Sequence, residues 1–218
     1  MIRKNHTPER TQDFSLIETI LWEKGNFFLL GRHMARLEKS AEYFSFPVDF
    51  AAVISSLEKT ARDFDPQNKY RVRLLADTSG KTSISSSVIL PPPVPARIKF
   101  SDKKTDKTNI FLSHKTTMRE LYDKELKEAR KKGYFEVLFT NSAGEVAEGA
   151  ITNIIIKRGD VYLTPPLSSG VLPGTYREFL FSSRELPLKE QILYPDDVLS
   201  ADEVFIVNSV IKMIPARF

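Results

Sequence analysis

Cysteine is absent from all 218 residues of the chain. Its absence excludes a disulfide framework, a thiolate site for zinc or an iron–sulfur cluster, and a cysteine nucleophile. Long apolar runs are also missing, since the longest, at residues 87–90 and 151–156, are far too short to cross a membrane. Residues 1–13 are polar and charged, so we expect no secretion signal there. We therefore expect a soluble protein of the cytoplasm without a membrane partner.

The charge balance gives little sign of a nucleic-acid partner. The chain has 32 Lys and Arg against 28 Asp and Glu, with a net charge of +4 and a pI of about 9.1. A basic pI can indicate binding to nucleic acid or to an anionic substrate, but here the excess is small and scattered. Its densest cluster, residues 99–107, is interrupted by two Asp residues and contains one aromatic residue. We expect a solvated surface and no nucleic-acid partner.

The first half of the chain combines two strand hairpins with two helices. The hydrophobic content of 41% is enough for a sizeable core, and the spacing of apolar residues places the elements. Helical spacing of 3 and 4 residues is seen at Met34, Leu37, Ala41 and Phe44. The elements expected here are a hairpin of residues 14–22 and 27–30, helices at about 34–44 and 48–64, and a hairpin of residues 70–76 with a strand to about residue 90.

Residues 91–95, Pro-Pro-Pro-Val-Pro, predict a stiff extended connector. Proline has no N–H for a strand ladder and does not fit inside a helix. We take the connector as a boundary between domains of residues 1–92 and 93–218. The elements expected after it are a helix at 118–132, strands at 135–140 and up to 156, a short strand ending at 164, a helix from 173–174 and a final strand at 203–208. This arrangement indicates an α+β or mixed α/β fold.

Four features of the sequence carry potential chemistry, and each alone also has an ordinary structural explanation. Lys115 precedes a predicted helix and could be a solvated lysine. Glu148 and Gly149 interrupt a β-rich stretch, which is also typical of a bulge. Residues 172–175 begin a predicted helix, and they could bind phosphate at its N-terminus or simply start the helix. Arg36, on the first helix, could be a surface charge.

The order and spacing of these features carry more weight than any one of them. Lys115 is followed by E-G-A-I-T-N at 148–153, T-P-P at 164–166 and L-P-G-x-x-R at 172–177. Three further elements accompany them: E-T at 18–19, H-x-x-R-L-x-x-S-A at 33–41 and A-D-E-V-F at 201–205. This series resembles the class IV aminotransferase family, the fold-type IV pyridoxal-phosphate enzymes. The resemblance extends from about residue 14 to residue 215.

The resemblance implies a fold, a cofactor and partners. The fold would consist of a small N-terminal α/β sandwich domain and a larger C-terminal pseudo-barrel domain that carries Lys115. The cofactor, pyridoxal 5′-phosphate (PLP), would lie between the two domains. Relatives act on small-molecule substrates with carboxylates and build part of each site at a subunit interface, so the resemblance implies a homodimer. None of these properties calls for a metal ion.

Three residues match the family's reactive positions. Lys115 would bind the cofactor covalently and move a proton once the substrate amine has displaced it. Glu148 would face the pyridine nitrogen, where a carboxylate favours the protonated pyridinium and so its capacity to accept electrons. Asn153 is expected to support the loop around Glu148 rather than to act as a catalyst.

Four other residues match positions around the cofactor phosphate. Arg36 would bind the phosphate directly. The backbone N–H groups of Thr175 and Tyr176 would assist, because the N-terminus of a helix favours an anion. Ser209 lies where relatives use a small hydroxyl residue against the same phosphate. The resemblance therefore implies an anion site built from a cation, a helix N-terminus and a hydroxyl.

Several reactions compete within the family. Branched-chain and D-amino acid aminotransferases need a second, keto-acid substrate, whereas aminodeoxychorismate lyase releases pyruvate from 4-amino-4-deoxychorismate and leaves 4-aminobenzoate. The run H-K-T-T-x-R-x-x-Y-D at 114–123 is similar to lyase-type members, including lyase domains fused to aminodeoxychorismate synthase. Residues 11–18 lack the tyrosine and glycines of the Y-G-D/E-G-x-F-E element found in many relatives. Both observations favour the lyase, with an aminotransferase as the alternative and a non-catalytic binding protein as a remote one.

Cationic residues near the site are candidates for binding substrate carboxylates. Arg119 follows Lys115 by one helical turn and would contact either the substrate or an acidic neighbour. Arg71 and Arg73 share one face of a predicted strand, and Arg73 aligns with a substrate-contacting position of some relatives. The planar fork of arginine suits carboxylates, although a solvent-facing strand is an equal alternative.

Overall fold

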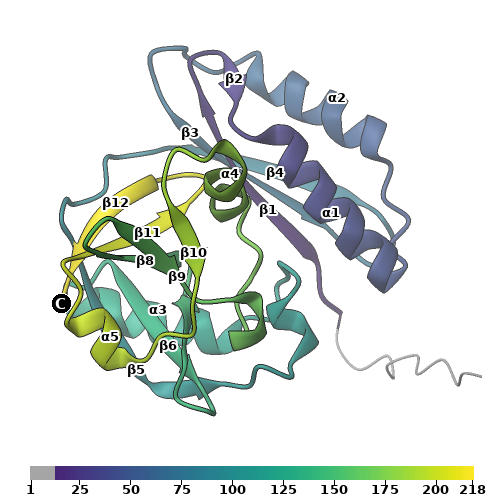
Figure 1. Cartoon of the computed structure of the whole chain (residues 1–218). Coiled ribbons are helices and arrows are strands. Elements are labelled where there is room, and N and C mark those ends of the chain that lie inside the picture. Colours follow the sequence, from purple (N-terminus) through teal and green to yellow (C-terminus); the bar gives the residue numbers. More distant parts are fainter. Residues whose placement is uncertain (1–12) are drawn as a thin grey trace, which may run out of the picture.

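The computed structural model of the chain describes residues 13–218 (Figure 1). The expectations for residues 1–12, including the start of the stretch that lacks the family's tyrosine, lie outside the described residues. Within the described part, no helix has both the length and the apolar character needed to cross a membrane.

The first half of the chain forms a four-stranded antiparallel sheet in the order β2-β1-β3-β4. Two helices, α1 and α2, lie side by side on one face of this sheet (Figure 1). The apolar side chains between the helices and the sheet form one hydrophobic core. The bounds are β1 Leu16–Glu23, β2 Asn26–Phe27, α1 Leu30–Phe44, α2 Phe50–Ala61, β3 Tyr70–Ala76 and β4 Thr82–Val88.

Local sequence accounts for most of these elements. The turn between β1 and β2 places Lys24 at φ 51° and Gly25 at φ 83°, as a two-residue hairpin loop requires. Along β3, Val72 and Leu74 are buried while Arg71 and Arg73 are exposed on the other face. The expected helices and hairpins are confirmed, but the return strand is shorter than expected because α1 already begins at residue 30.

The second half forms an eight-stranded mixed sheet in the order β10-β9-β8-β11-β12-β5-β6-β7, which curls into a half-barrel (Figure 1). This confirms the mixed α/β fold. Its buried apolar residues form three further clusters. The bounds are β5 Ala96–Thr105, α3 Glu120–Lys131, β6 Glu136–Asn141, β7 Val146–Gly149, β8 Asn153–Arg158, β9 Val161–Thr164, α4 Thr175–Ser183, β10 Leu188–Glu190, α5 Pro195–Leu199, β11 Glu203–Asn208 and β12 Lys212–Arg217, with short 3-10 helices at Ile110–Leu112 and Leu167–Ser169.

The second half differs from the expected elements in three places. Residues 96–105 form β5, a central strand that was not among the expected elements; Ile98, Ser101 and Thr105 are buried, while the charges of the cluster at 99–107 lie outside. The expected strand up to residue 156 is broken at 150–152 into β7 and β8. Finally, the strand at 203–208 is not the last one, because β12 follows it and continues through Pro215 to the residues paired with β5.

The two sheets meet along β1. Residues 115–117 run beside the start of this strand, where Ile17 N donates to the Lys115 carbonyl at 2.8 Å and Thr117 N to the Ser15 carbonyl at 2.9 Å. Helix α4 contacts both α1 and β11 (Figure 1). The division at residues 92 and 93 falls in the segment between the sheets and stays a prediction.

Candidate active site

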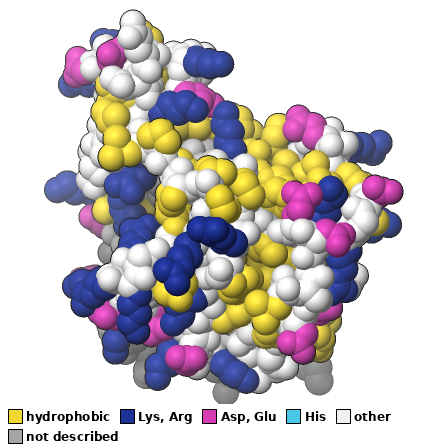
Figure 2. Space-filling model, turned by 90° about the vertical axis from the view of Figure 1, so that its left-hand side faces the viewer, with side chains coloured by type: hydrophobic (Ala, Val, Ile, Leu, Met, Phe, Trp, Pro, Cys, Tyr) yellow, Lys and Arg dark blue, Asp and Glu magenta, His cyan; other side chains and the backbone are white. Residues whose placement is uncertain are grey.

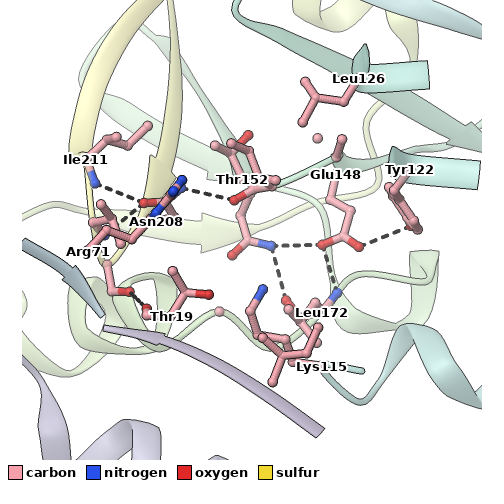
Figure 3. Close-up of a pocket in the computed structure, with 18 of the residues that line it drawn as sticks. Thr19, Arg71, Lys115, Tyr122, Leu126, Glu148, Thr152, Leu172, Asn208 and Ile211 are labelled. Atoms are coloured by element: carbon pink, nitrogen blue, oxygen red, sulfur yellow. Dashed lines mark hydrogen bonds between the residues drawn. The ribbon is translucent and has the colours of Figure 1, made fainter. Parts of the chain in front are cut away.

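A cavity of about 720 Å³ lies where the two sheets meet, lined by residues of β1, β3, β7, α3, α4 and the β11–β12 turn (Figure 3). Eight of the nine residues predicted from sequence line it: Arg36, Arg73, Lys115, Arg119, Glu148, Asn153, Thr175 and Ser209. The side chain of Tyr176 does not, and packs instead beside Phe28 and Phe179. The role expected for Tyr176 rests on its backbone N–H and stays a prediction, as do the roles of the other eight.

Lys115 lies at the base of this cavity, below the hydrogen-bonded group around Glu148 (Figure 3). The pairing with β1 fixes its backbone. Burial lowers the pKa of Lys115 to about 7, and the positive charges of Arg36 and Arg119 act in the same direction. An amine with this pKa has a substantial neutral fraction near pH 7, and the neutral form is the nucleophile.

Glu148 is the next-to-last residue of β7 and is almost completely buried. Its carboxylate accepts hydrogen bonds from the Tyr122 hydroxyl at 3.2 Å, the Asn153 amide at 3.3 Å and Leu172 N at 3.0 Å. Burial raises the pKa of Glu148 to about 7, against the effect of these hydrogen bonds and of Lys115. A desolvated carboxylate of this kind is strongly stabilised by a cationic partner in the cavity.

A buried network of charges connects Arg36 to Glu18. Arg36 donates from Nε to Glu18 Oε1 at 2.8 Å and from Nη2 to Oε2 at 2.6 Å. His33 Nδ1 lies 2.6 Å from Glu18 Oε2, and its Nε2 lies 3.4 Å from the Thr175 hydroxyl. Burial raises the pKa of Glu18, but Arg36 and His33 outweigh it and hold that pKa at about 2. The network thus ties Arg36 to the start of α4.

The N-terminus of α4 faces the same region. Gly174 precedes the helix, and a Cβ atom there would collide with the side-chain oxygen of Asn153, so the close approach requires glycine. The first N–H groups of a helix have no acceptor within it, and those of Thr175 and Tyr176 belong to this set. Arg36 also donates from Nη1 to the Pro173 carbonyl at 3.1 Å. A cation and free N–H donors therefore converge at one point, which suits an anion.

Ser209 lies in the turn between β11 and β12. Its hydroxyl donates to the Thr19 carbonyl of β1 at 3.1 Å, so it bridges the two sheets. Asn208 shapes the turn, because its side-chain oxygen accepts from Val210 N at 2.8 Å and Ile211 N at 2.9 Å (Figure 3). This geometry holds the Ser209 hydroxyl at the edge of the cavity.

Besides Arg36, four arginines line the cavity: Arg71, Arg73, Arg119 and Arg130. Burial lowers the pKa of Arg73, and the charge of Arg119 lowers it further, so these two guanidinium groups lie within reach of each other's field. Arg119 donates to Asp123 at 2.8 Å and to the Ala150 carbonyl at 2.8 Å. Asp123 is therefore the acidic neighbour that was one of the two expected partners of Arg119. The Ala150 carbonyl is a second partner that the sequence did not indicate.

Sequence reasoning assigned no role to Glu18, His33, Tyr122 or Glu136. Three of them stand inside the quoted motifs: Glu18 in E-T, His33 in H-x-x-R-L and Tyr122 in the run after Lys115. Their positions within the motifs were the available signal. Glu136 lies in a strand and has no motif to mark it.

Comparison with known proteins agrees with this site. The sequence model of the amino-transferase class IV family matches residues 15–217. The chain therefore belongs to this family of enzymes, which depend on pyridoxal 5′-phosphate.

Individual relatives carry two different activities in their names. A probable branched-chain-amino-acid aminotransferase of Thermotoga maritima is 25% identical over 96% of this chain and 78% of its own length. The aminodeoxychorismate lyase of Bacillus subtilis is 26% identical over 92% of this chain and 75% of its own. Among solved structures, the chain is similar to the crystal structure of a "putative amino-acid aminotransferase" from Mesorhizobium loti. The two are 32% identical with a TM-score of 0.87, and the match covers 94% of this chain and 99% of that one.

The residues around the cavity fit the family's cofactor. Lys115 supplies a buried amine with a lowered pKa, and Glu148 supplies a buried carboxylate in need of a cationic partner. Arg36 and the start of α4 supply an anion site. All three features line one cavity, and their chemistry suits the aldehyde, the pyridine nitrogen and the phosphate of a single molecule.

Proposed function

We propose that this chain is a PLP-dependent lyase that converts 4-amino-4-deoxychorismate into 4-aminobenzoate and pyruvate, a step of folate biosynthesis. The observation that carries the proposal is the cationic side of the cavity. Arg71 and Arg73 line it from β3, and Arg119 lines it from the start of α3. A substrate with two carboxylates matches a cavity with several guanidinium groups.

The run around Lys115 supports the same reaction. Its H-K-T-T-x-R-x-x-Y-D pattern is similar to that of lyase-type members, and in the structure Arg119 and Tyr122 of this run both line the cavity. The relative from Bacillus subtilis is named as an aminodeoxychorismate lyase. Pattern, pocket and relative thus favour one substrate.

The chain's own residues would divide the work as follows. When bound, PLP supplies an electron-accepting ring that stabilises negative charge on the substrate carbon next to nitrogen. Glu148 would favour the protonated form of the pyridine nitrogen, and Arg36 with the start of α4 would hold the phosphate. Lys115 removes the proton from the substrate carbon that bears the amine. Arg73 and Arg119 orient the substrate carboxylates.

The alternative is a branched-chain or D-amino acid aminotransferase. The relative from Thermotoga maritima, named as a probable branched-chain-amino-acid aminotransferase, supports it at nearly the same identity. A non-catalytic binding protein is a more remote alternative. It is disfavoured because Lys115, Glu148 and Arg36 are all present and face one cavity.

A turnover assay separates the two reactions. A lyase regenerates its resting cofactor in every cycle, so the enzyme should form many equivalents of 4-aminobenzoate and pyruvate from 4-amino-4-deoxychorismate with no keto acid added. An aminotransferase would stop after one half-reaction until 2-oxoglutarate or pyruvate is supplied. A panel of branched-chain and D-amino acids with a keto acid is run beside it. No aromatic product together with rapid turnover of the panel would establish the aminotransferase instead.

A homodimer in the cytoplasm completes the proposal. Residues 87–93, at the end of β4 and just after it, line the cavity. Exposed apolar side chains lie in and beside this stretch, with Val88 52%, Leu90 82% and Val94 62% exposed. Figure 2 shows apolar side chains across much of this side of the molecule, with Lys and Arg beside them. Such a surface at the rim of a site supports a second copy as its partner. Sedimentation of the purified enzyme tests this.

A further inference from the structure

Glu136, at the start of β6, is a fully buried acid that the reaction above does not use. Its Oε1 accepts hydrogen bonds from Val137 N at 2.9 Å and Ala150 N at 3.1 Å. Its Oε2 accepts from Ile151 N at 3.0 Å and the Thr152 hydroxyl at 2.9 Å. Burial raises the pKa of Glu136, and the four hydrogen bonds oppose that rise. Each carboxylate oxygen thus accepts two hydrogen bonds, and an ionised carboxylate has the lone pairs to accept all four.

Three of these donors belong to one turn, residues 150–152, between β7 and β8. The carbonyl groups of the same turn are also bound: that of Ala150 accepts from Arg119 at 2.8 Å and that of Ile151 from Asn208 at 3.0 Å. The Thr152 carbonyl accepts from Gly149 N at 2.8 Å. The N–H groups of Ala150 and Ile151 and the carbonyl groups of all three turn residues therefore have hydrogen-bond partners, as a buried loop requires.

Gly149 lets the carboxylate approach this turn closely. A Cβ atom on Gly149 would lie 2.9 Å from the carboxyl carbon of Glu136 and would collide with the Thr152 hydroxyl. Gly149 has no positive φ that would call for glycine by itself. Because Gly149 has no side chain, the carboxylate of Glu136 can reach the turn at 150–152.

The turn decides where two cavity residues lie. Glu148 precedes it and Asn153 follows it, and the two side chains meet at 3.3 Å inside the cavity. We infer that Glu136 is a positioning residue that, through the turn at 150–152, sets the placement of Glu148 against the cofactor's pyridine ring. The inference rests on the proposed function only through the PLP chemistry of the family, not through the choice of substrate.

Small displacements at this position matter for chemistry. A misplacement of about 1 Å caused by a residue outside the reacting groups can lower a rate by about 100-fold. Glu136→Gln keeps the size of the side chain but turns an NH₂ group toward N–H or hydroxyl donors. At least one pair of buried donors then faces another donor, so the turn has to shift.

The experiment compares Glu136→Gln with Glu145→Gln. Glu145 is a matched control, because it is also buried, lies on the same β6–β7 hairpin and accepts from the Asn141 amide at 2.6 Å, yet does not line the cavity. Three quantities are measured: amide hydrogen exchange of Ala150 and Ile151 in the apoprotein, the PLP dissociation constant, and the pH dependence of the absorption spectrum of bound PLP. The rate constant kcat is measured on whichever substrate the wild type turns over.

For Glu136→Gln we expect faster exchange at residues 150 and 151, a shifted spectral titration and a kcat lower by about 10- to 100-fold, with KM little changed. Glu145→Gln should differ only in thermal stability. Wild-type spectra and kcat in folded Glu136→Gln, or equal changes in both variants, would overturn the inference and leave Glu136 a structural residue.

Thr152→Val provides the second test, and it decides the matter if Glu136→Gln does not fold. It removes one of the four donors and keeps the shape of the side chain. We expect the same three changes at smaller size, and wild-type values would overturn the inference. Exchange and spectra do not depend on the substrate, so failure of the lyase assay alone would contradict the proposed function and not the role of Glu136.

Discussion

Arg36 and Glu18 form a paired, two-bond contact in which the same guanidinium that is expected to bind phosphate also neutralises a buried acid. Glu18 is 1% exposed and Arg36 11% exposed, so the pair is largely shielded from water. Arg36 uses one N–H of each of its three nitrogens for Glu18 and Pro173. A guanidinium has five N–H groups, so two remain for an anion.

Arg36→Ala should therefore weaken PLP binding and also destabilise the fold. Loss of a charge-assisted contact worth roughly 1.5–3 kcal/mol lowers PLP affinity by about one to two orders of magnitude. Glu18 keeps its contact with His33 but loses the two bonds from its buried arginine partner, which lowers the free energy of unfolding by about 3–5 kcal/mol. Urea unfolding and PLP titration measure the two effects. Arg32→Ala, on the same helix, is the control, and equal stability of the two variants would contradict the pairing argument.

The lowered pKa of Lys115 predicts how PLP attachment depends on pH. Only the neutral amine attacks an aldehyde, and burial with nearby arginines shifts the pKa of Lys115 down to about 7. The neutral fraction, and with it the rate of covalent attachment, should rise with pH through a midpoint near 7. Stopped-flow absorbance on the apoprotein measures the rate, with N-acetyl-lysine as reference. Attachment should be fixed by borohydride to Lys115, and a rate still rising steeply at pH 10 would contradict the shift.

Arg73 and Arg119 should behave differently when each is replaced by alanine. The side chain of Arg73 has no hydrogen bond or ion pair within the described residues, so Arg73→Ala should raise KM and lower kcat/KM by about 10-fold with little change in kcat. Arg119→Ala should also lower kcat, because it releases the Ala150 carbonyl. Steady-state kinetics separate the two. Arg97→Ala, which removes a guanidinium stacked on Tyr134 outside the cavity, serves as the control.

Tyr122→Phe tests the hydrogen bond to Glu148. The groups that face Glu148 are Tyr122, Asn153, Leu172 N, Lys115 and Arg119, and Tyr122 stabilises its ionised form. Without this donor the pKa of Glu148 should rise, so the acidic limb of kcat/KM against pH should move upward by about half to one pH unit.

Tyr134→Phe is the matched variant for that measurement, because Tyr134 does not line the cavity. An acidic limb that stays in place in Tyr122→Phe would mean that the hydroxyl does not stabilise the Glu148 carboxylate. A limb that moves equally in both variants would trace the change to the fold rather than to this contact.

Elements with strong local signals were predictable. The 3- and 4-residue spacing of apolar residues located α1, and the turn residues Lys24 and Gly25 located the first hairpin. The strand β5 was not predicted, because the charged side chains on its outer face give its sequence the pattern of a solvated surface. The break at 150–152 was not predicted, because Ala150 and Ile151 are apolar and the contacts from Glu136 and Asn208 that hold the turn come from residues distant in the sequence.

The chain by itself determined which chemical groups are present and in what order: an amine at Lys115, an acid at Glu148, a guanidinium at Arg36 and a proline-rich connector. Only the tertiary structure decided that burial brings the pKa of Lys115 and that of Glu148 both to about 7, that Arg36 is paired with Glu18, and that Glu136 holds the turn beside Glu148. Desolvation and hydrogen bonding depend on distances between groups far apart in the chain, and those distances exist only after folding.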